Sequence, residues 1–172
     1  MQIYTLGHST RTVERLVKIL EKYEIQIVAD IRTVPRSRTN PQFNKDSLPI
    51  FLKQRCINYS HVKSLGGLRH PSKVSKNLGW INKSFRGYAD HMQTEEFEHG
   101  IRDLLESASE ARIAIMSAEA LPWRCHRRLV GDALVVRGIN VIDILSENRA
   151  QNHELTKWAK VEGTRVTYPR QI

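Results

Sequence analysis

The sequence predicts one α/β domain spanning residues 1–172, with helices on both faces of a largely parallel sheet. Three observations support this fold class. Strand-sized apolar runs alternate with helical patterns along the chain. The first three elements are a strand, a helix and a strand, which is the order of a right-handed parallel βαβ unit. The run RIAIMSA at 112–118 is almost continuously apolar, as expected for a strand covered on both faces.

The N-terminal elements follow from hydrophobic periodicity. Apolar runs at 2–6 and 25–31 predict the first two strands. Between them, apolar residues recur at i, i+3, i+4 and i+7, which predicts an amphipathic helix containing Val13, Leu16, Val17 and Leu20. A hydroxyl side chain before this run is expected to cap it, the candidates being Ser9, Thr10 and Thr12.

The middle of the chain is less regular. Prolines favour a loop over 33–45, followed by a short helix at 46–55 and a third strand at 57–62. A long basic loop is expected at 63–86, because this stretch is rich in glycine, serine and lysine. Long loops inside compact domains are often lids or binding loops, so this loop is a candidate lid. A longer helix is expected at 87–106.

The C-terminal part of the chain continues the alternation of strands and helices. A helix is predicted at 122–137, with Pro122 in its first turn and Gly138 just past its end. The last clear strand is expected at 139–145, followed by a polar tail with one short strand at 165–168. No internal repeat or linker divides the chain into two domains.

The net charge of +9 is unevenly distributed. Residues 31–89 contain twelve Lys and Arg and a single acid, Asp46, which gives this segment a balance of +11. The other residues include 15 basic and 17 acidic side chains, a balance of −2. A basic segment of this kind attracts polyanions such as nucleic acids. The alternative is a solvated surface that is rich in arginine.

Several common classes of site are disfavoured. The two cysteines, Cys56 and Cys125, lie far apart in the sequence, so neither a disulfide framework nor a CxxC metal motif is expected. Motifs of zinc proteases, P-loop enzymes and dinucleotide-binding domains are also absent. No apolar run approaches the length of a membrane span, and the N-terminus lacks the pattern of a signal peptide. We therefore expect a cytoplasmic protein.

Polar or ionisable residues follow three of the predicted strands. His8 and Ser9 follow the first strand, Asp30 and Arg32 end the second, and Glu119 follows the fourth. Because open parallel sheets bind ligands at the carboxyl ends of their strands, we expect a shared site at this edge. The alternative is that each residue has a local role, as a helix cap, an ion-pair partner or a loop anchor.

Within the segment SAEALPWRCHRRLVG at 117–131, the four residues CHRR at 125–128 place a thiol, an imidazole and two guanidinium groups at the predicted start of a helix. On a helical wheel, His126 faces the sheet, and Cys125 and Arg127 flank the buried stripe. A helix N-terminus lowers the pKa of a thiol and favours anions. Cys125 is therefore a candidate nucleophile and Arg127 a candidate anion ligand. The alternatives are an inert buried thiol and a core histidine bonded to a carboxylate.

Two further segments are candidate binding elements. In DIRTVPRSR at 30–38, Pro35 stiffens a turn that presents Arg36, Ser37 and Arg38 close together, which suits an anion, although a solvated basic loop is the alternative. Further along, two glycines allow a ligand to approach the backbone, and three aromatic residues can stack on bases or anchor the loop to the core. These residues are Gly66, Gly67, Trp80, Phe85 and Tyr88.

Five segments, in chain order, resemble the domain-of-unknown-function family 488: TLGHS, DIRTVPRSR, INYSHVKSLGG, RGYADHM and SAEALPWRCHRR. The resemblance covers about residues 3–145 and implies a Rossmann-like α/β domain, without implying an activity. The motif residues that it carries over are His8, Ser9, Asp30, Arg32, Pro35, Ser37, Arg38, Gly66, Gly67, Tyr88, Glu119, Cys125, His126 and Arg127.

The chain departs from the family at two positions. The family usually has cysteine where this chain has Ser117, within a Cys-Ala-Glu motif, and glycine where this chain has Cys56. A family mechanism that used a cysteine pair would therefore have lost one member here. This favours, as the retained unit, Glu119, Cys125, His126 and Arg127.

Together these features suggest an enzyme that acts on a phosphate-bearing substrate, either a nucleic acid or a nucleotide. A carboxylate would act as acid or base with a histidine, and arginines would hold the anion. The carboxylate is Asp30 or Glu119, the histidine is His126 or His8, and the arginines are Arg32, Arg38 and Arg127. The alternatives are a non-catalytic nucleic-acid-binding module and a small-anion sensor domain. No ligand spacing supports a metal site, and the sequence identifies no cofactor and no oligomeric state.

Overall fold

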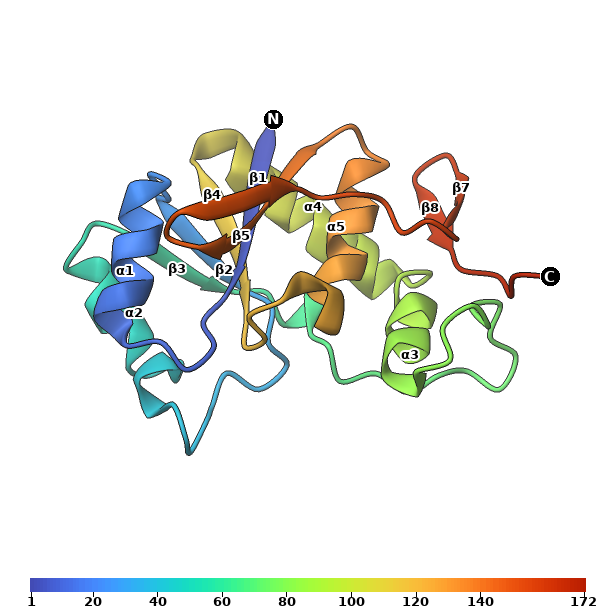
Figure 1. Cartoon of the computed structure of the whole chain (residues 1–172), viewed down its shortest axis with the longest axis horizontal. Coiled ribbons are helices and arrows are strands. Elements are labelled where there is room, and N and C mark those ends of the chain that lie inside the picture. Colours follow the sequence, from blue (N-terminus) through green and yellow to red (C-terminus); the bar gives the residue numbers. More distant parts are fainter.

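The computed structural model describes residues 1–172 and confirms a three-layer, Rossmann-like α/β domain (Figure 1). The central sheet has the strand order β3-β2-β4-β1-β5-β6, in which the first five strands are parallel and β6 is antiparallel. A separate hairpin is formed by β7 and β8. The strands are β1 (Gln2–Gly7), β2 (Ile27–Asp30), β3 (Asn58–His61), β4 (Ile113–Ser117), β5 (Asn140–Ser146), β6 (Arg149–Asn152), β7 (Lys160–Glu162) and β8 (Arg165–Thr167).

Helices cover both faces of the sheet. One face is covered by α1 (Val13–Lys22) and α2 (Leu48–Lys53), and the other by α3 (Lys83–His91), α4 (Glu95–Glu110) and α5 (Arg127–Val135). The loops contain three short 3-10 helices, which are η1 (Pro41–Phe43), η2 (Lys63–Leu65) and η3 (Pro122–Arg124). None of the helices combines the length and the apolar character that a bilayer span requires.

The side-chain alternation of β4 explains why its sequence is apolar throughout. Ile113 and Ile115 belong to the core beneath α4 and α5, whereas Ala114 and Met116 belong to the core beneath α1 and α2. A central strand therefore contributes to two hydrophobic layers at once. Full burial of each large apolar side chain contributes about 1.5–3 kcal/mol to folding.

The helix predicted at 87–106 is in fact two helices. Thr94 separates α3 from α4, because its Oγ1 accepts a hydrogen bond from Phe97 N (3.3 Å) and donates one to the His91 carbonyl (2.7 Å). The apolar pattern continues across this break, since Tyr88 and Met92 lie in the same core cluster as Phe97. Hydrophobic periodicity alone therefore could not reveal the helix cap at Thr94.

The helix predicted at 122–137 begins later than expected. Pro122 initiates the 3-10 turn η3, Cys125 is extended (φ −140°, ψ 152°), and α5 begins only at Arg127. The prediction that Cys125 lies in the first turns of this helix is therefore wrong, because it directly precedes the helix. Gly138 lies past the helix end, as predicted, with a φ of 77°.

The segment predicted as a basic loop at 63–86 contains η2 at its start and the first turn of α3 at its end, which leaves 66–82 irregular. Asp90 of α3 anchors the loop at 66–82, because its carboxylate accepts hydrogen bonds from Ser72 N (2.8 Å) and Ser75 Oγ (2.6 Å). A lid function for the loop stays a prediction.

The polar tail contributes more structure than its sequence predicts. Asp132 of α5 accepts hydrogen bonds from His153 Nε2 (3.0 Å), Thr156 N (3.1 Å) and Tyr168 Oη (2.7 Å). His153 Nδ1 also lies 2.8 Å from a carboxylate oxygen of Asp143. Burial lowers the pKa of His153, but the two carboxylates outweigh it and raise the pKa to about 9. The protonated His153 ring therefore holds the C-terminal tail against α5 and β5.

Cys56 occupies a backbone position that suits glycine. Its φ is 55°, in the left-handed region, and its side chain is exposed. In this conformation the steric strain of a Cβ destabilises the folded state by about 1–2 kcal/mol. Glycine avoids that strain, but its more flexible unfolded chain lowers the free energy of unfolding by about 0.5–1 kcal/mol. Cys56→Gly is therefore expected to raise the free energy of unfolding by about 0–1 kcal/mol, measured by urea denaturation.

The matched control for this variant is Lys53→Gly, at an exposed position in the last turn of α2. Glycine there should lower the free energy of unfolding by about 1 kcal/mol. A destabilisation by Cys56→Gly as large as that of the control would contradict the strain argument.

Candidate functional site

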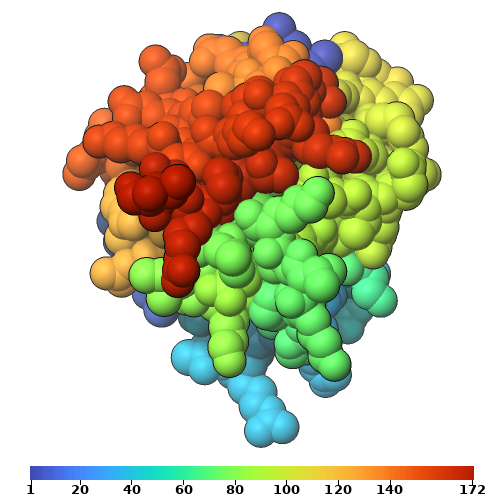
Figure 2. All heavy atoms as spheres, turned by 90° about the vertical axis from the view of Figure 1, so that its right-hand side faces the viewer, coloured from blue at the N-terminus to red at the C-terminus, as the bar shows by residue number.

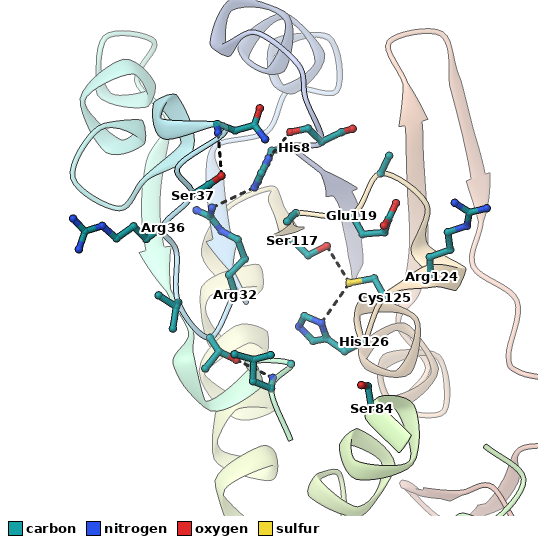
Figure 3. Close-up of a pocket in the computed structure, with 18 of the residues that line it drawn as sticks. His8, Arg32, Arg36, Ser37, Ser84, Ser117, Glu119, Arg124, Cys125 and His126 are labelled. Atoms are coloured by element: carbon teal, nitrogen blue, oxygen red, sulfur yellow. Dashed lines mark hydrogen bonds between the residues drawn. The ribbon is translucent and has the colours of Figure 1, made fainter. Parts of the chain in front are cut away.

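An open pocket of about 660 Å³ lies at the carboxyl edge of the sheet (Figure 3). The strands β2, β4 and β1 are neighbours, so the polar residues that follow them converge at this edge. Backbone hydrogen bonds join the strand ends, from His8 N to the Ser117 carbonyl and from Ser9 N to the Ala118 carbonyl, both 2.9 Å. The predicted site residues that line the pocket are His8, Ser9, Arg32, Ser37, Gly67, Glu119, Cys125 and His126.

The remaining predicted site residues lie outside the lining. Asp30, Gly66, Tyr88 and Arg127 are buried behind it, and Arg38 is exposed beside it. Arg36 and Phe85, which belong to the two segments predicted as binding elements, also line the pocket. The sequence analysis did not place in the site a further set of lining residues, namely Thr10, Thr33, Val34, Asn40, Leu68, Ser84, Ser117, Ala118, Ala120 and Arg124. Most of them are sequence neighbours of predicted residues, which is the signal that could have found them.

The thiol of Cys125 lies among groups that stabilise a thiolate. Its Sγ is 3.3 Å from Ser117 Oγ, 3.4 Å from His126 Nδ1 and 3.5 Å from Arg127 N, the first amide of α5. The backbone amide donates to the sulfur, and the positive end of the helix dipole reinforces this contact. Only 9% of Cys125 is exposed, and it faces the pocket.

The hydrogen bonds of His126 determine its tautomer. Its Nε2 lies 3.0 Å from the carbonyl oxygen of Ile31, which can only accept a hydrogen bond. The Nε2 atom must therefore carry a proton. In the neutral ring, Nδ1 then has a free lone pair that faces Cys125 Sγ and can accept the thiol proton.

The pKa of Cys125 is lowered to about 7, from an ordinary value of 9.0. Burial is the largest single influence and raises the pKa. The hydrogen bond and charge of His126, the charge of Arg127 and the hydrogen bond of Ser117 together outweigh it. The thiolate is therefore a major species at neutral pH, which meets the requirement for a nucleophile.

Arg127 supports this thiolate from beneath. It is 1% exposed, and its Nη1 donates to Ser117 Oγ (3.0 Å) while its Nη2 donates to the Ala120 carbonyl (3.1 Å). Because Arg127 supplies a proton to Ser117 Oγ, the serine hydroxyl hydrogen is free to point to the Cys125 thiolate. Burial also lowers the pKa of Arg127. Its role in this geometry is therefore to support the sulfur rather than to contact a ligand directly.

Arg32 presents one free donor to the pocket. Its Nε and Nη2 donate to the two oxygens of Asp30 at 2.9 and 2.6 Å, and Nη2 also donates to the Phe43 carbonyl at 2.6 Å. Its Nη1 lies 3.2 Å from His8 Nε2, which accepts one of the two Nη1 hydrogens. The second Nη1 hydrogen remains available for a ligand, because a guanidinium group has five donors.

Asp30 and His8 orient Arg32 and are fully engaged. The carboxylate of Asp30 is completely buried and also accepts from Tyr59 Oη (2.6 Å) and Arg32 N (3.1 Å). His8 donates from Nδ1 to the Ser9 carbonyl (2.8 Å) and stacks on Phe43. Burial lowers the pKa of His8 to about 4, so its ring is neutral at physiological pH. In this geometry both residues hold Arg32 in place, and their predicted catalytic roles stay predictions.

Glu119 is the one carboxylate in the pocket lining. It is exposed, it follows β4, and no hydrogen bond or ion pair engages its side chain. Six hydroxyl side chains contribute further polar groups, those of Ser9, Thr10, Thr33, Ser37, Ser84 and Ser117. No cluster of three or more His, Cys, Asp or Glu side chains in the structure could hold a metal ion. The thiol, the imidazole and the free carboxylate are groups suited to nucleophilic and acid–base chemistry.

The thiol should titrate at neutral pH. In a Cys56→Gly background, which removes the exposed second thiol, the rate of Cys125 alkylation by iodoacetamide should rise with pH through a midpoint near 7. His126→Asn should move this midpoint upward toward the ordinary value of 9.0. An unchanged midpoint in the variant would show that His126 does not stabilise the thiolate.

Gly67 keeps the His126 ring in place. A Cβ on Gly67 would lie 2.5 Å from His126 Nδ1, so Gly67→Ala must displace the ring. The alkylation midpoint of Cys125 is expected to rise in this variant, because the contact between Nδ1 and Sγ is lost. Leu68→Ala is the matched control, since the adjacent Leu68 is 75% exposed. Equal midpoints for the two variants would contradict this role of Gly67.

Comparison with known proteins gives a family but no characterised relative. The family model described as "Domain of unknown function DUF488" matches residues 12–134, more than half of the chain. The match includes every predicted site residue except His8 and Ser9, which lie before it. No curated protein and no solved structure matches the chain significantly. The chain therefore belongs to the DUF488 family.

Proposed function

We propose that this protein is an enzyme that acts on a phosphate-bearing substrate, a nucleotide or nucleic acid, with Cys125 as its nucleophile. One observation supports this proposal above all others. Cys125 Sγ faces an open pocket while it contacts an imidazole nitrogen and the first amide of α5, at 3.4 and 3.5 Å. A binding module has no need of a thiol that is held as a thiolate.

His126 would accept the thiol proton on Nδ1 and remain an imidazolium through the cycle. The Ile31 carbonyl keeps Nε2 protonated, so the ring bears its charge next to the sulfur. Arg127, which contributes to the lowered pKa of the thiol, adds a second positive charge behind it. Once this proton has moved to His126, the thiolate needs no further proton transfer before it attacks.

The substrate phosphate would bind between the sulfur and Arg32. The free Nη1 hydrogen of Arg32 would donate to this anion, and Ser37 would supply a hydroxyl group beside it. Asp30 neutralises much of the charge of Arg32, so this contact acts mainly as a fixed hydrogen-bond donor. These residues correspond to the preorganised donors that stabilise charge in a transition state.

The proposed reaction is phosphoryl transfer in two displacements. In the first, the Cys125 thiolate forms a bond to phosphorus, the bond from phosphorus to the leaving oxygen breaks, and that oxygen takes a proton from solvent in the open pocket. In the second, water attacks phosphorus and gives a proton to the Glu119 carboxylate, and the sulfur–phosphorus bond breaks to restore the thiolate. No oxidant or reductant is needed, because neither step changes an oxidation state.

Variants of two residues test this proposal. Cys125→Ser should abolish turnover of phosphate esters, screened with nitrophenyl phosphate, nucleotides and oligonucleotides. Glu119→Gln should lower turnover by about 10²–10⁴-fold. It should also accumulate a phosphorylated protein, detected by intact-protein mass spectrometry and mapped to Cys125. Cys56→Gly serves as the control that retains the nucleophile, since Cys56 lies at the opposite edge of the sheet. Full turnover by Cys125→Ser would refute the mechanism.

A further inference from the structure

The rim of the pocket carries cations that lack a carboxylate partner. Among the twelve Lys and Arg of residues 31–89, ion pairs with carboxylates engage only Arg32, Arg55 and Arg69. Arg36 and Arg124 line the pocket, and Figure 3 shows their side chains extending away from its centre on opposite sides. Neither forms an ion pair, so both remain available to a partner that extends beyond the pocket.

Two more free cations continue this rim. Arg38 is exposed next to Ser37, and Lys83 is exposed next to Ser84, and both serines line the pocket. The four cations of the rim come from three separate elements, which are the loop after β2, the start of α3 and η3. They are Arg36, Arg38, Lys83 and Arg124. Their positive charges therefore lie around the pocket opening, and the centre of the pocket stays open to a ligand.

Two loops meet to form one wall of the pocket. Leu68 N donates a hydrogen bond to Thr33 Oγ1 (3.0 Å), which joins the loop after β2 to the loop at 66–82. In Figure 2 these loops appear as the light-blue arm at the lower edge and the green surface above it. Their junction lies directly at the pocket, because Thr33 and Leu68 both line it.

Apolar side chains at this wall are unusually exposed. Val34 is 61% exposed and Leu68 is 75% exposed, and both line the pocket together with the half-buried ring of Phe85. Phosphate alone gains nothing from these side chains, whereas the face of a nucleobase would cover them. The pocket volume of about 660 Å³ also lies within the usual range for organic ligands.

We propose that the rim binds a single-stranded nucleic acid and that one unpaired nucleotide of the strand enters the pocket. This inference rests on the proposed function, for which it selects a polymer as the substrate. The base of the inserted nucleotide contacts Val34, Leu68 and Phe85. The phosphates on either side of it contact the four rim cations. A duplex fits less well, because its base faces are stacked and unavailable to the apolar wall.

The charge count gives this proposal a quantitative test. If the strand makes four phosphate contacts, the binding constant should fall as the salt concentration rises. A plot of the logarithm of the binding constant against the logarithm of the salt concentration should have a slope of about −3. Affinity should thus drop about 50-fold between roughly 50 and 200 mM salt. The probe is fluorescein-labelled oligothymidylate or oligouridylate of about 20 nucleotides, longer than most single-domain binding sites. Fluorescence anisotropy with the full chain measures the binding.

Single substitutions should locate the rim. Arg38→Ala and Lys83→Ala should each weaken oligonucleotide binding and reduce the magnitude of the slope by about 0.7. Lys53→Ala is the matched control, because Lys53 is an exposed, unpaired cation of the same basic segment near the amino edge of the sheet. Its slope should equal that of the unmodified protein. An equal effect of all three substitutions would overturn the proposal, as would tighter binding of a duplex of the same sequence.

The two proposals can fail separately. Cys125→Ser should bind the oligonucleotide as tightly as the unmodified protein, even if no turnover is ever found, and that result would support the rim proposal alone. Turnover of a mononucleotide that requires Cys125, without any oligonucleotide affinity at low salt, would overturn the rim proposal and leave the catalytic one standing.

Discussion

The hydrogen bond from His126 Nε2 to the carbonyl of Ile31 determines how the rest of the site behaves. It links the segment before α5 to the end of β2, 95 residues away in the sequence. The carbonyl cannot donate, so the imidazole has one available tautomer, and its free nitrogen faces the sulfur of Cys125. Gly67 and Tyr88 then hold the ring in that orientation from two sides. The reactivity of the thiol therefore depends on a backbone group of a different strand.

A second layer of support comes from buried charges that neutralise one another. Asp30 and Arg32 form an ion pair in which each carboxylate oxygen accepts two hydrogen bonds. Breaking such a pair by removing one partner is strongly destabilising, because the other charge is left buried without compensation. Arg127 lacks a carboxylate partner within ion-pair distance, and the Cys125 thiolate takes part of that role. The site thus receives positive charge from beneath, in addition to the cations of its lining.

The alternation of apolar segments was enough to predict the fold class, the five parallel strands and the convergence of three strand ends. The break at Thr94 was not predictable, because the apolar spacing continues through it and only a side-chain cap interrupts the helix. The strand β6 was missed for a different reason, since all four of its residues are exposed and show no alternation. Among the candidate residues, His126 reaches the sheet as the helical wheel predicted, although the helix begins after it.

The burial and the hydrogen-bond partners of individual site residues could not be predicted, because they depend on tertiary contacts between distant segments of the chain. Asp30 and Glu119 are both carboxylates beside strand ends, and no local sequence pattern distinguishes them. The structure buries Asp30 against Arg32 and Tyr59 and leaves Glu119 in the open pocket. Arg127, predicted as an anion ligand at the helix start, is buried behind the lining, whereas Arg124 of η3 lines the pocket.

The hydroxyl group of Ser117 also has a consequence for oxidative chemistry. Its oxygen lies 3.3 Å from Cys125 Sγ, where a second thiol would be close enough to resolve an oxidised sulfur, but a hydroxyl cannot do so. The only other thiol, Cys56, precedes β3 at the opposite edge of the sheet. If peroxide converts Cys125 to a sulfenic acid, no internal disulfide can form to protect it from further oxidation. Recovery then requires a small thiol that enters from solution through the same opening as the substrate.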